Sequence, residues 1–176
     1  MTIINEEMIP ALDQVGKGFE KGTVFLPQLL MSAEAAKAAF EVIKDQMQKS
    51  GQTQEKKGTI ILATVKGDIH DIGKNIVKVL LENYSFEIID LGKDVAPEII
   101  VQAVIDNNAP AVGLSALMTT TVPAMEKTIH LLKEKAPQCK IVVGGAVLNQ
   151  EYSDRIGADK YAKDAMETIR YTSTLK

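Results

Sequence analysis

The sequence predicts an α/β protein in which a five-stranded parallel sheet carries helices on both faces and is preceded by a short helical cap. From Gly58 onward, short apolar runs alternate with helical segments, which is typical of parallel strands joined by crossover helices. The apolar runs are almost continuous, as expected for strands that are buried on both faces. The length of 176 residues, 45% of them hydrophobic and 24% charged, suits one such core and an appendage.

The N-terminal part contains two helical segments, around Asn5–Glu20 and around Pro27–Lys49. The second has apolar residues at three- and four-residue spacing, so it presents a stripe that must pack on something. The polar stretch that follows has no periodicity and predicts a linker. We therefore expect a helical cap over residues 1–50, a linker over 51–57 and the sheet domain over 58–176.

The alternation in the sheet domain predicts five strands, each followed by a helix. In chain order the expected elements are strand 59–65, helix 73–84, strand 86–91, helix 97–107, strand 110–115, helix 121–135, strand 139–143, helix 149–156, strand 158–161 and helix 164–174. We expect a flavodoxin-like (Rossmann-type) strand order. Ligands of such sheets bind beyond the carboxyl ends of the strands, near the point where the strand order reverses. The loops after the first, third and fourth strands lie there.

Composition argues against several classes of protein. The formal net charge of −3 and a pI near 5.5, without a block of Lys or Arg, give no dominant surface for nucleic acid or anionic membranes. No apolar stretch approaches the roughly 20 residues that span a bilayer, and no signal-peptide pattern opens the chain, so we expect a cytoplasmic protein. The single Cys139 can neither form an internal disulfide nor anchor a zinc cluster.

The stretch GDIHDIGKN at residues 67–75 directly follows the first apolar run. Residues i and i+2 of an extended segment point the same way, so the Asp68 carboxylate can hold one ring nitrogen of His70 and leave the other free for a ligand. A phosphate-binding loop matches poorly, because Asp68 and Asp71 would repel phosphate. An ordinary zinc or iron site also matches poorly, since His130 is the only other histidine. One protein nitrogen suffices where a macrocycle already holds the metal.

The stretch Gly67–Val77, with its Asp-x-His-x-x-Gly pattern, resembles the cobalamin-binding motif of corrinoid methyltransferase proteins, including the cobalamin module of methionine synthase. GLS at residues 113–115, with the threonines that follow it, is similar to the second motif of that family. VGGA at 143–146 is similar to the third, and residues 22–30 resemble the helical cap of methyl carriers. The similarity covers nearly the whole chain, and these motifs together are far more specific than any one of them.

The resemblance implies that cobalamin is the cofactor and that His70 is the metal ligand, replacing the cofactor's own benzimidazole below the cobalt. Asp68 would hydrogen-bond the far nitrogen of His70. Thr121 would end the relay to solvent, keeping the hydroxyl of the serine that family members often have there. These three residues form the expected catalytic group, which would couple proton uptake to the oxidation state of cobalt. The expected cofactor contacts are Gly67, Asp68, His70, Asp71, Gly73, Ser115, Thr119, Gly144, Gly145 and Ala165, with Phe25 over the upper face.

The function that the resemblance implies is a methyl carrier cycling between cobalt(I) and methyl-cobalt(III). One methyltransferase partner would load the methyl group and a second would remove it, with a reductive activase as a further partner, so the chain alone is more a carrier than a complete enzyme. An adenosylcobalamin-dependent mutase subunit shares the motif and is the alternative. The sensor half of a cobalamin-dependent regulator is a weaker one, because it needs a DNA-binding element that the sequence does not offer.

The cap differs from the pattern of the family. Methyl carriers of this type usually have a four-helix cap, whereas residues 1–50 contain about two helices. Two amphipathic helices leave an apolar face without a partner. We therefore expect either a homodimer through the caps or a chain cut short at its start.

Overall fold

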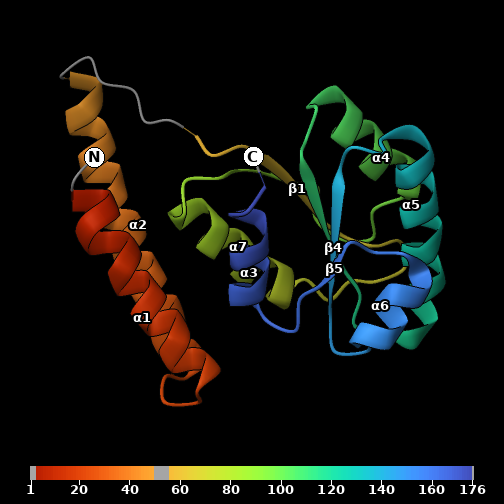
Figure 1. Cartoon of the computed structure of the whole chain (residues 1–176), viewed down its shortest axis with the longest axis horizontal. Coiled ribbons are helices and arrows are strands. Elements are labelled where there is room, and N and C mark those ends of the chain that lie inside the picture. The colour runs from red at the N-terminus through yellow and green to blue at the C-terminus, as the bar shows by residue number, and fades with distance from the viewer. Residues whose placement is uncertain (1–2, 50–55, 176) are drawn as a thin grey trace.

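The computed structural model describes residues 3–49 and 56–175, which form a helical hairpin beside an α/β domain (Figure 1). The hairpin consists of a π-helical turn η1 (Ile4–Met8), helix α1 (Ile9–Glu20) and helix α2 (Leu26–Lys49). It confirms the predicted helical cap. Most of the predicted linker, 51–57, lies outside the described residues.

The α/β domain alternates strands and helices as predicted. Its elements are β1 (Thr59–Thr64), α3 (Ile72–Asn83), β2 (Glu87–Asp90), α4 (Pro97–Asp106), β3 (Ala111–Ser115), the 3-10 turn η2 (Thr119–Thr121), α5 (Val122–Lys135), β4 (Lys140–Gly144), α6 (Gln150–Ile156), β5 (Lys160–Tyr161) and α7 (Ala165–Thr172). Neighbouring strands are all parallel, in the order β2-β1-β3-β4-β5. This confirms the flavodoxin-like order and puts the reversal of strand order between β1 and β3.

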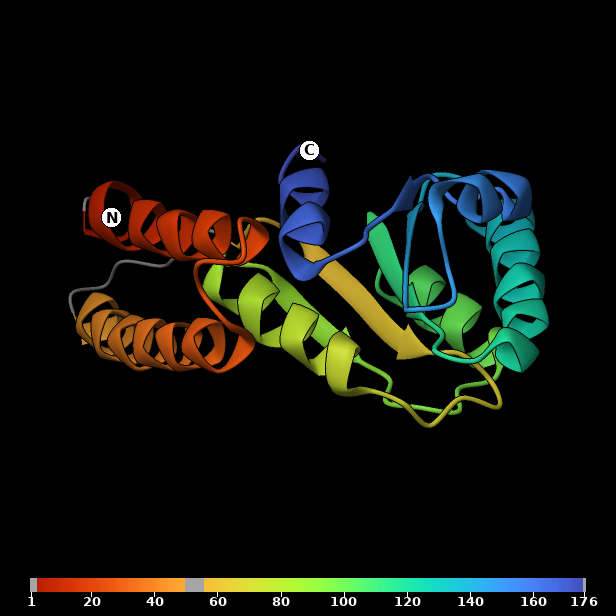
Figure 2. The same ribbon diagram turned by 90° about the horizontal axis from the view of Figure 1, so that it is seen from below.

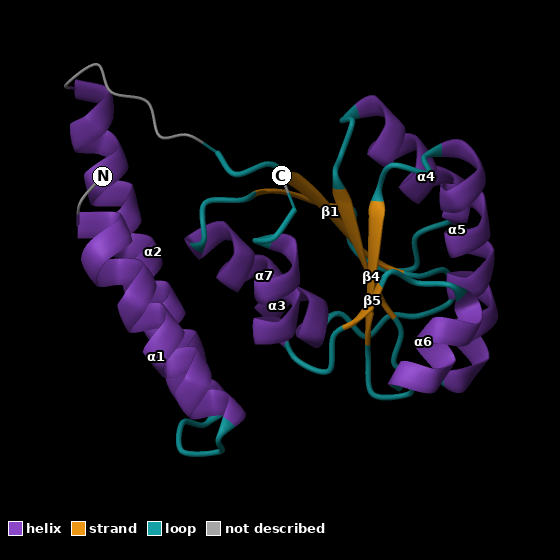
Figure 3. Ribbon diagram, viewed as in Figure 1, coloured by secondary structure: helices purple, strands orange, loops and turns teal. Residues whose placement is uncertain are grey.

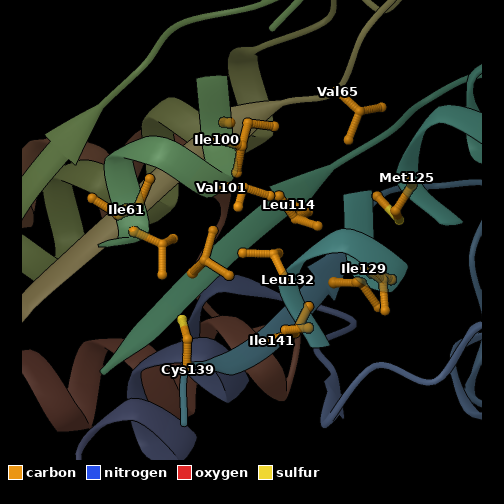
Figure 4. Close-up of a cluster of buried hydrophobic side chains, with 14 of the residues drawn as sticks. Ile61, Val65, Ile100, Val101, Leu114, Met125, Ile129, Leu132, Cys139 and Ile141 are labelled. Atoms are coloured by element: carbon orange, nitrogen blue, oxygen red, sulfur yellow. The ribbon is translucent and has the colours of Figure 1, made fainter. Parts of the chain in front are cut away.

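Helices cover both faces of the sheet, with α3 and α7 on one side and α4, α5 and α6 on the other (Figure 3). Successive side chains of a strand point to opposite faces. Ile61 and Val65 therefore join the core against α4 and α5, whose packed side chains are shown in Figure 4. Ile60 and Leu62 join the other core, on the side of α3.

The cap packs on the sheet domain through this second core. Leu29 and Ala33 of α2 are buried together with Leu80 of α3. The buried side-chain amide of Asn83 donates to the carbonyl oxygen of Ala33 at 2.9 Å, which joins the end of α3 to α2. From this attachment the hairpin extends away from the sheet domain (Figure 2). None of the helices in the described part of the chain has the length and apolarity of a membrane span.

Candidate functional site

The loop between β1 and α3 carries the Asp-x-His motif and turns at Gly67. Gly67 has a φ of 86°, in the left-handed region that glycine adopts without penalty. The backbone N of Asp68 donates to the carbonyl oxygen of Val65 at 3.0 Å and closes the turn. The chain therefore points the Asp68 side chain into the protein, where its exposed fraction is 0%.

Both carboxylate oxygens of Asp68 accept hydrogen bonds. Oδ1 accepts from the backbone N and from Nδ1 of His70, at 3.0 and 2.8 Å. Oδ2 accepts from the backbone N of Leu117 and Met118, at 2.7 and 3.2 Å, and from Oγ1 of Thr121 at 2.9 Å. Burial by itself raises the pKa of Asp68, but the bonds from His70, Leu117 and Thr121 outweigh it and hold this pKa well below its usual range. Asp68 is therefore ionised at neutral pH.

The ionised Asp68 determines which nitrogen of His70 can bind a ligand. Nδ1 must carry the ring proton in order to donate to Asp68, so the lone pair of a neutral ring lies on Nε2. The His70 side chain is 45% exposed, and Nε2 has no hydrogen-bond partner among the described residues. The arrangement presents one oriented nitrogen with its lone pair at the surface.

Exposed apolar side chains lie near this nitrogen. Ile69, Ile72 and Leu117 are 62%, 75% and 41% exposed, and they line the same cavity as His70. Exposed apolar side chains gathered at one cavity are typical of a binding site. A large ligand with an apolar face would cover it.

The cavity itself measures about 650 Å³ and extends from His70 between the sheet and helices α3 and α7. Gly113, Ser115 and Gly144, at the carboxyl ends of β3 and β4, line its sheet side. The cap contributes Phe19 and Leu26 to its wall. The cavity thus lies where ligands of this fold bind, beside the reversal of strand order.

The glycines around the cavity have different reasons to be glycine. Gly145 has a φ of 136°, and a Cβ there would overlap the carbonyl oxygen of Ala116. A Cβ on Gly144 would lie 3.3 Å from the carbonyl oxygen of Ala162. At Gly73, by contrast, a Cβ would meet nothing within 4 Å. The protein itself therefore requires Gly145, whereas only a ligand in the cavity would require Gly73.

The structure brings most of the predicted contact residues to one place. Seven of them line the cavity: His70, Asp71, Gly73, Ser115, Gly144, Gly145 and Ala165. Asp68 and Gly67 lie behind His70 and shape its loop. Two predicted contacts lie elsewhere, because Thr119 is exposed on η2 and Phe25, which is 68% exposed, precedes α2. Neither lines the cavity, and the cap wall is formed by Leu26 and Phe19 instead.

Thr121 contacts Asp68 as expected but does not lead to solvent. Its exposed fraction is 4%, and its hydroxyl lies 2.8 Å from the carbonyl oxygen of Met118 as well as 2.9 Å from Asp68 Oδ2. A hydroxyl has one proton, so it donates to one of these acceptors at a time. When the hydroxyl donates to Asp68, the chain of hydrogen bonds therefore ends at the buried Thr121 hydroxyl.

Sequence reasoning missed Lys74, which lines the cavity although its side chain is only 2% exposed. Its Nζ lies 2.6 Å from Asp90 Oδ1 and 2.7 Å from Asn75 Oδ1. The position after the motif glycine was visible in the sequence, but the partner on β2 was not. Leu62 and Gly113 were also missed, and they line the cavity together because they are register partners on β1 and β3.

The donor set fits a metal that arrives in a macrocycle. Among the described residues, no group of three or more His, Cys, Asp or Glu side chains could hold a metal ion. What the site offers is one free imidazole nitrogen, an apolar rim and a deep slot. This combination suits a metal that is already coordinated, with a bulky tail beside it.

Comparisons with known proteins agree with this geometry. A family model described as a B12 binding domain matches residues 58–170, and a second B12 binding domain model matches residues 1–44. Dimethylamine corrinoid protein 1 of Methanosarcina acetivorans is 43% identical over 169 residues, which is 95% of this chain and 79% of that protein.

Two solved structures are similar over nearly the whole chain. A cobalamin-binding protein from Desulfitobacterium hafniense has a TM-score of 0.80 and 33% identity, covering 93% of this chain and 77% of that one. The methanol:cobalamin methyltransferase complex of Methanosarcina barkeri has a TM-score of 0.82 and 30% identity, covering 99% of this chain and 66% of that one. These relatives give the mutase alternative no support. The chain belongs to the B12-binding family, as a corrinoid protein of a methyltransferase system, and its cofactor is cobalamin.

Proposed function

We propose that this chain carries methyl groups between methyltransferase partners on a cobalamin whose lower axial ligand is His70. The observation that carries the proposal is the pair of Asp68 and His70, 2.8 Å apart, in which a buried carboxylate fixes the ring and leaves Nε2 free beside a cavity of about 650 Å³. When bound, cobalamin supplies a cobalt that accepts a methyl group and gives it up again. The protein supplies the ligand, the slot and the partner surfaces.

The cavity explains how the cofactor's own base would be accommodated. If His70 takes its place below the cobalt, the displaced nucleotide tail needs a slot. The space between the sheet and helices α3 and α7 offers one, with Ser115 as a hydroxyl partner and Gly144 without a side chain. The apolar rim of Ile69, Ile72 and Leu117 would then lie under the corrin.

The hydrogen bonds of Asp68 determine which nitrogen of His70 is open to a ligand or a proton. The carboxylate has five donors around it, and they hold its pKa well below the usual range. Because Nδ1 is paired with the ionised Asp68, Nε2 is the nitrogen that would hold the cobalt or, in its place, a proton. The Thr121 hydroxyl stays in place and supports the charge of Asp68.

The decisive experiment is spectroscopic. The protein is loaded with cobalamin, reduced to cobalt(II) and examined by electron paramagnetic resonance with nitrogen-15-labelled histidine. We expect hyperfine coupling that follows the label, that is lost in His70→Gln and that persists in His130→Gln. The second variant is a matched control, because His130 is the other histidine and is exposed on α5. Retention of the cofactor's benzimidazole in the wild type would overturn the proposal.

Membership of the family implies that the chain works with partner methyltransferases. Assays with candidate methyl donors can identify them. The names of the relatives supply the first methyl donors to try, dimethylamine and methanol. We propose that one partner loads the cobalt, another unloads it and a reductive activase restores it after accidental oxidation. Methylation of the loaded chain that needs a donor and its methyltransferase together would support this scheme, and methylation by the chain alone would contradict it. We also propose a cytoplasmic location, which cell fractionation can check.

The cap carries two further proposals. Phe25 is 68% exposed beside Leu26, and we propose that it shields the upper face of the bound corrin when the cap moves. Faster aerobic oxidation of cobalt in Phe25→Ala would support this role. Ile3, Met31 and Val42 are 62%, 69% and 63% exposed on the hairpin, which favours a homodimer through the caps. A monomer in sedimentation equilibrium would refute the dimer.

A further inference from the structure

The loop between β2 and α4 lies beside the loop between β1 and α3, which carries Asp68, and is hydrogen-bonded to it. Val95 forms a parallel bridge with Val65, and Asp94 precedes it. The backbone N of Asp94 donates to the carbonyl oxygen of Asp68 at 2.9 Å. In return, the backbone N of Gly67 donates to Oδ1 of Asp94 at 2.8 Å. Asp94 therefore binds both ends of the Gly67–Asp68 dipeptide.

Both partners of this contact have an unusual backbone. Gly67 has a φ of 86° and Asp94 a φ of 56°. A left-handed φ is uncommon for any residue other than glycine, and aspartate is among the few that tolerate it. Such a conformation persists where surrounding contacts enforce it, and it often accompanies a functional constraint.

The charge of Asp94 strengthens the contact. The Gly67 amide and Lys66, whose Nζ lies 3.0 Å from Oδ1, keep the pKa of Asp94 below its usual value. The carboxylate is thus ionised at neutral pH, and a hydrogen bond to an ionised acceptor is stronger than one to a neutral acceptor. The Gly67 amide is consequently held by a full negative charge.

Asp94 can influence the site only through this dipeptide. Its side chain is 45% exposed, it does not line the cavity, and within the described residues it has no hydrogen bond to His70 or Thr121. The Asp68 carboxylate, however, must meet donors from its own loop and from the loop after β3 at once. A small rotation of the Gly67–Asp68 peptide would misalign these bonds, because hydrogen bonds weaken steeply away from their preferred angles.

We propose that Asp94 is a positioning residue, which fixes Asp68 from the neighbouring loop and thereby strengthens the bond between His70 and cobalt. The inference rests on the proposed role of His70 as the lower ligand. A purely structural role for Asp94, closing its own loop, would leave that bond unchanged.

Two substitutions separate the hydrogen bond from the backbone conformation. Asp94→Gly tolerates the left-handed φ but has no acceptor for the Gly67 amide. Asp94→Asn tolerates the same φ and keeps a carbonyl acceptor, with a weaker bond. Glu98→Gln is the matched control, because it removes an exposed carboxylate of α4 that pairs with Lys127 at 2.8 Å, away from the Asp68 loop.

The measurement is the ratio of histidine-bound to histidine-free cobalt(II) in the loaded protein, read from the nitrogen coupling at one fixed alkaline pH, where protons do not compete for Nε2. A weaker hold on His70 lowers this ratio. We expect a roughly threefold or larger fall in Asp94→Gly, in line with the net worth of one hydrogen bond. Asp94→Asn should lose less than half as much, and Glu98→Gln nothing. Both Asp94 variants remove the ion pair with Lys66, so the difference between them reports the hydrogen bond to Gly67.

A second readout uses the protein without cofactor. The Gly67 amide should exchange with deuterium roughly tenfold faster in Asp94→Gly, as expected for loss of a charge-assisted bond, while the amides of β1 keep their protection. General loss of protection in β1 would overturn the inference, because Asp94 would then stabilise the fold as a whole.

The outcomes separate this inference from the proposed function. If the wild-type protein shows no histidine coupling, both are overturned. If the wild type shows coupling but Asp94→Gly has the same ratio of bound to free histidine, only the positioning role of Asp94 fails. Equal falls of this ratio in Asp94→Gly and Glu98→Gln would also refute it, because the effect would then be one of surface charge.

Discussion

The two faces of the central sheet are built from the same strands in opposite ways. On the face covered by α4 and α5, Leu114 and Val143 are 2% and 0% exposed and belong to a close-packed core (Figure 4). On the other face, the preceding Gly113 and the following Gly144 have no side chain and line the cavity. At these positions of β3 and β4, one face supplies buried contacts while the other leaves room.

This difference shows that the binding slot is made by leaving side chains out. Because successive residues of a strand point to opposite faces, an alternation of large residue and glycine fills one face without closing the other. The cost is apolar surface left open along the slot, which bound cobalamin would cover. Stability and cofactor binding should therefore respond to different substitutions.

A cavity created in the core against α4 and α5 should give the largest change in the free energy of unfolding. Ile129 of α5 is 1% exposed in the core of Figure 4. Ile129→Ala should lower the free energy of unfolding by about 2 to 5 kcal/mol, because it removes buried contacts and leaves a void. The affinity of the folded protein for cobalamin should stay the same. Urea denaturation and cobalamin titration measure the two quantities.

The control for this prediction is Ile99→Ala, at a position of α4 that is 57% exposed, and it should change stability by no more than about 0.5 kcal/mol. A fall in cobalamin affinity that parallels the loss of stability in Ile129→Ala would show that the two faces are not independent.

Asp68 lies at the rim of the open face and is the one fully buried carboxylate among the described residues. Asp68→Asn keeps the size of the side chain but turns an NH₂ group toward backbone donors. The free energy of unfolding of the unloaded protein at pH 7 should fall by about 1.5 to 3 kcal/mol, the usual range for hydrogen bonds to a charged group. Urea denaturation of both proteins at a series of pH values measures it.

The stabilisation of the folded protein by Asp68 is expected to depend on pH in one direction. The folded pKa of Asp68 is lowered from 3.8, so its ionised form stabilises the folded protein above that value. The contribution is lost as the pH falls from 3.8 through the folded pKa. The difference in unfolding free energy between wild type and Asp68→Asn should therefore narrow as the pH falls below 3.8. A difference that widens below this pH would contradict the assignment.

The fold could be predicted from the sequence because its signals are local. Continuous apolar runs mark the parallel strands, and the predicted strand 59–65 and helix 121–135 differ by one residue from β1 and α5. The fifth strand was less accurate, since 158–161 was expected and only Lys160–Tyr161 form β5. A two-residue edge strand depends on its partner β4 more than on its own composition.

Only those contacts of the site that join residues close together in the sequence could be predicted. Asp68 and His70 are two residues apart, so their pairing follows from the geometry of an extended chain. The amides of Leu117 and Met118 come from the loop after β3, and their bonds to Asp68 depend on how that loop is placed against the motif. Likewise, whether Phe25 or Leu26 enters the cavity depends on the rotation of the hairpin, which no sequence pattern specifies.

Substitution of Gly73, which lines the cavity, should give the smallest change in the free energy of unfolding and separates stability from cofactor binding. Its φ is not left-handed, and a Cβ would meet nothing within 4 Å, so the unloaded protein gives no reason for glycine there. Gly73→Ala should raise the free energy of unfolding of the unloaded protein by about 0.4 to 1 kcal/mol, because alanine restricts the unfolded chain. Urea denaturation without cofactor measures this gain.

The same Cβ should weaken cobalamin binding, because Gly73 lines the cavity at the start of α3. Overpacking by one methyl group costs about 1 kcal/mol, which corresponds to a roughly fivefold loss of affinity. Gly144→Ala is the contrast, since its Cβ would lie 3.3 Å from the Ala162 carbonyl and should not stabilise the protein. Opposite signs for stability and affinity in Gly73→Ala would show that this glycine serves the ligand. A stabilised protein with unchanged affinity would show that the cofactor does not approach α3 there, and the slot would then have to be entered from elsewhere on the open face.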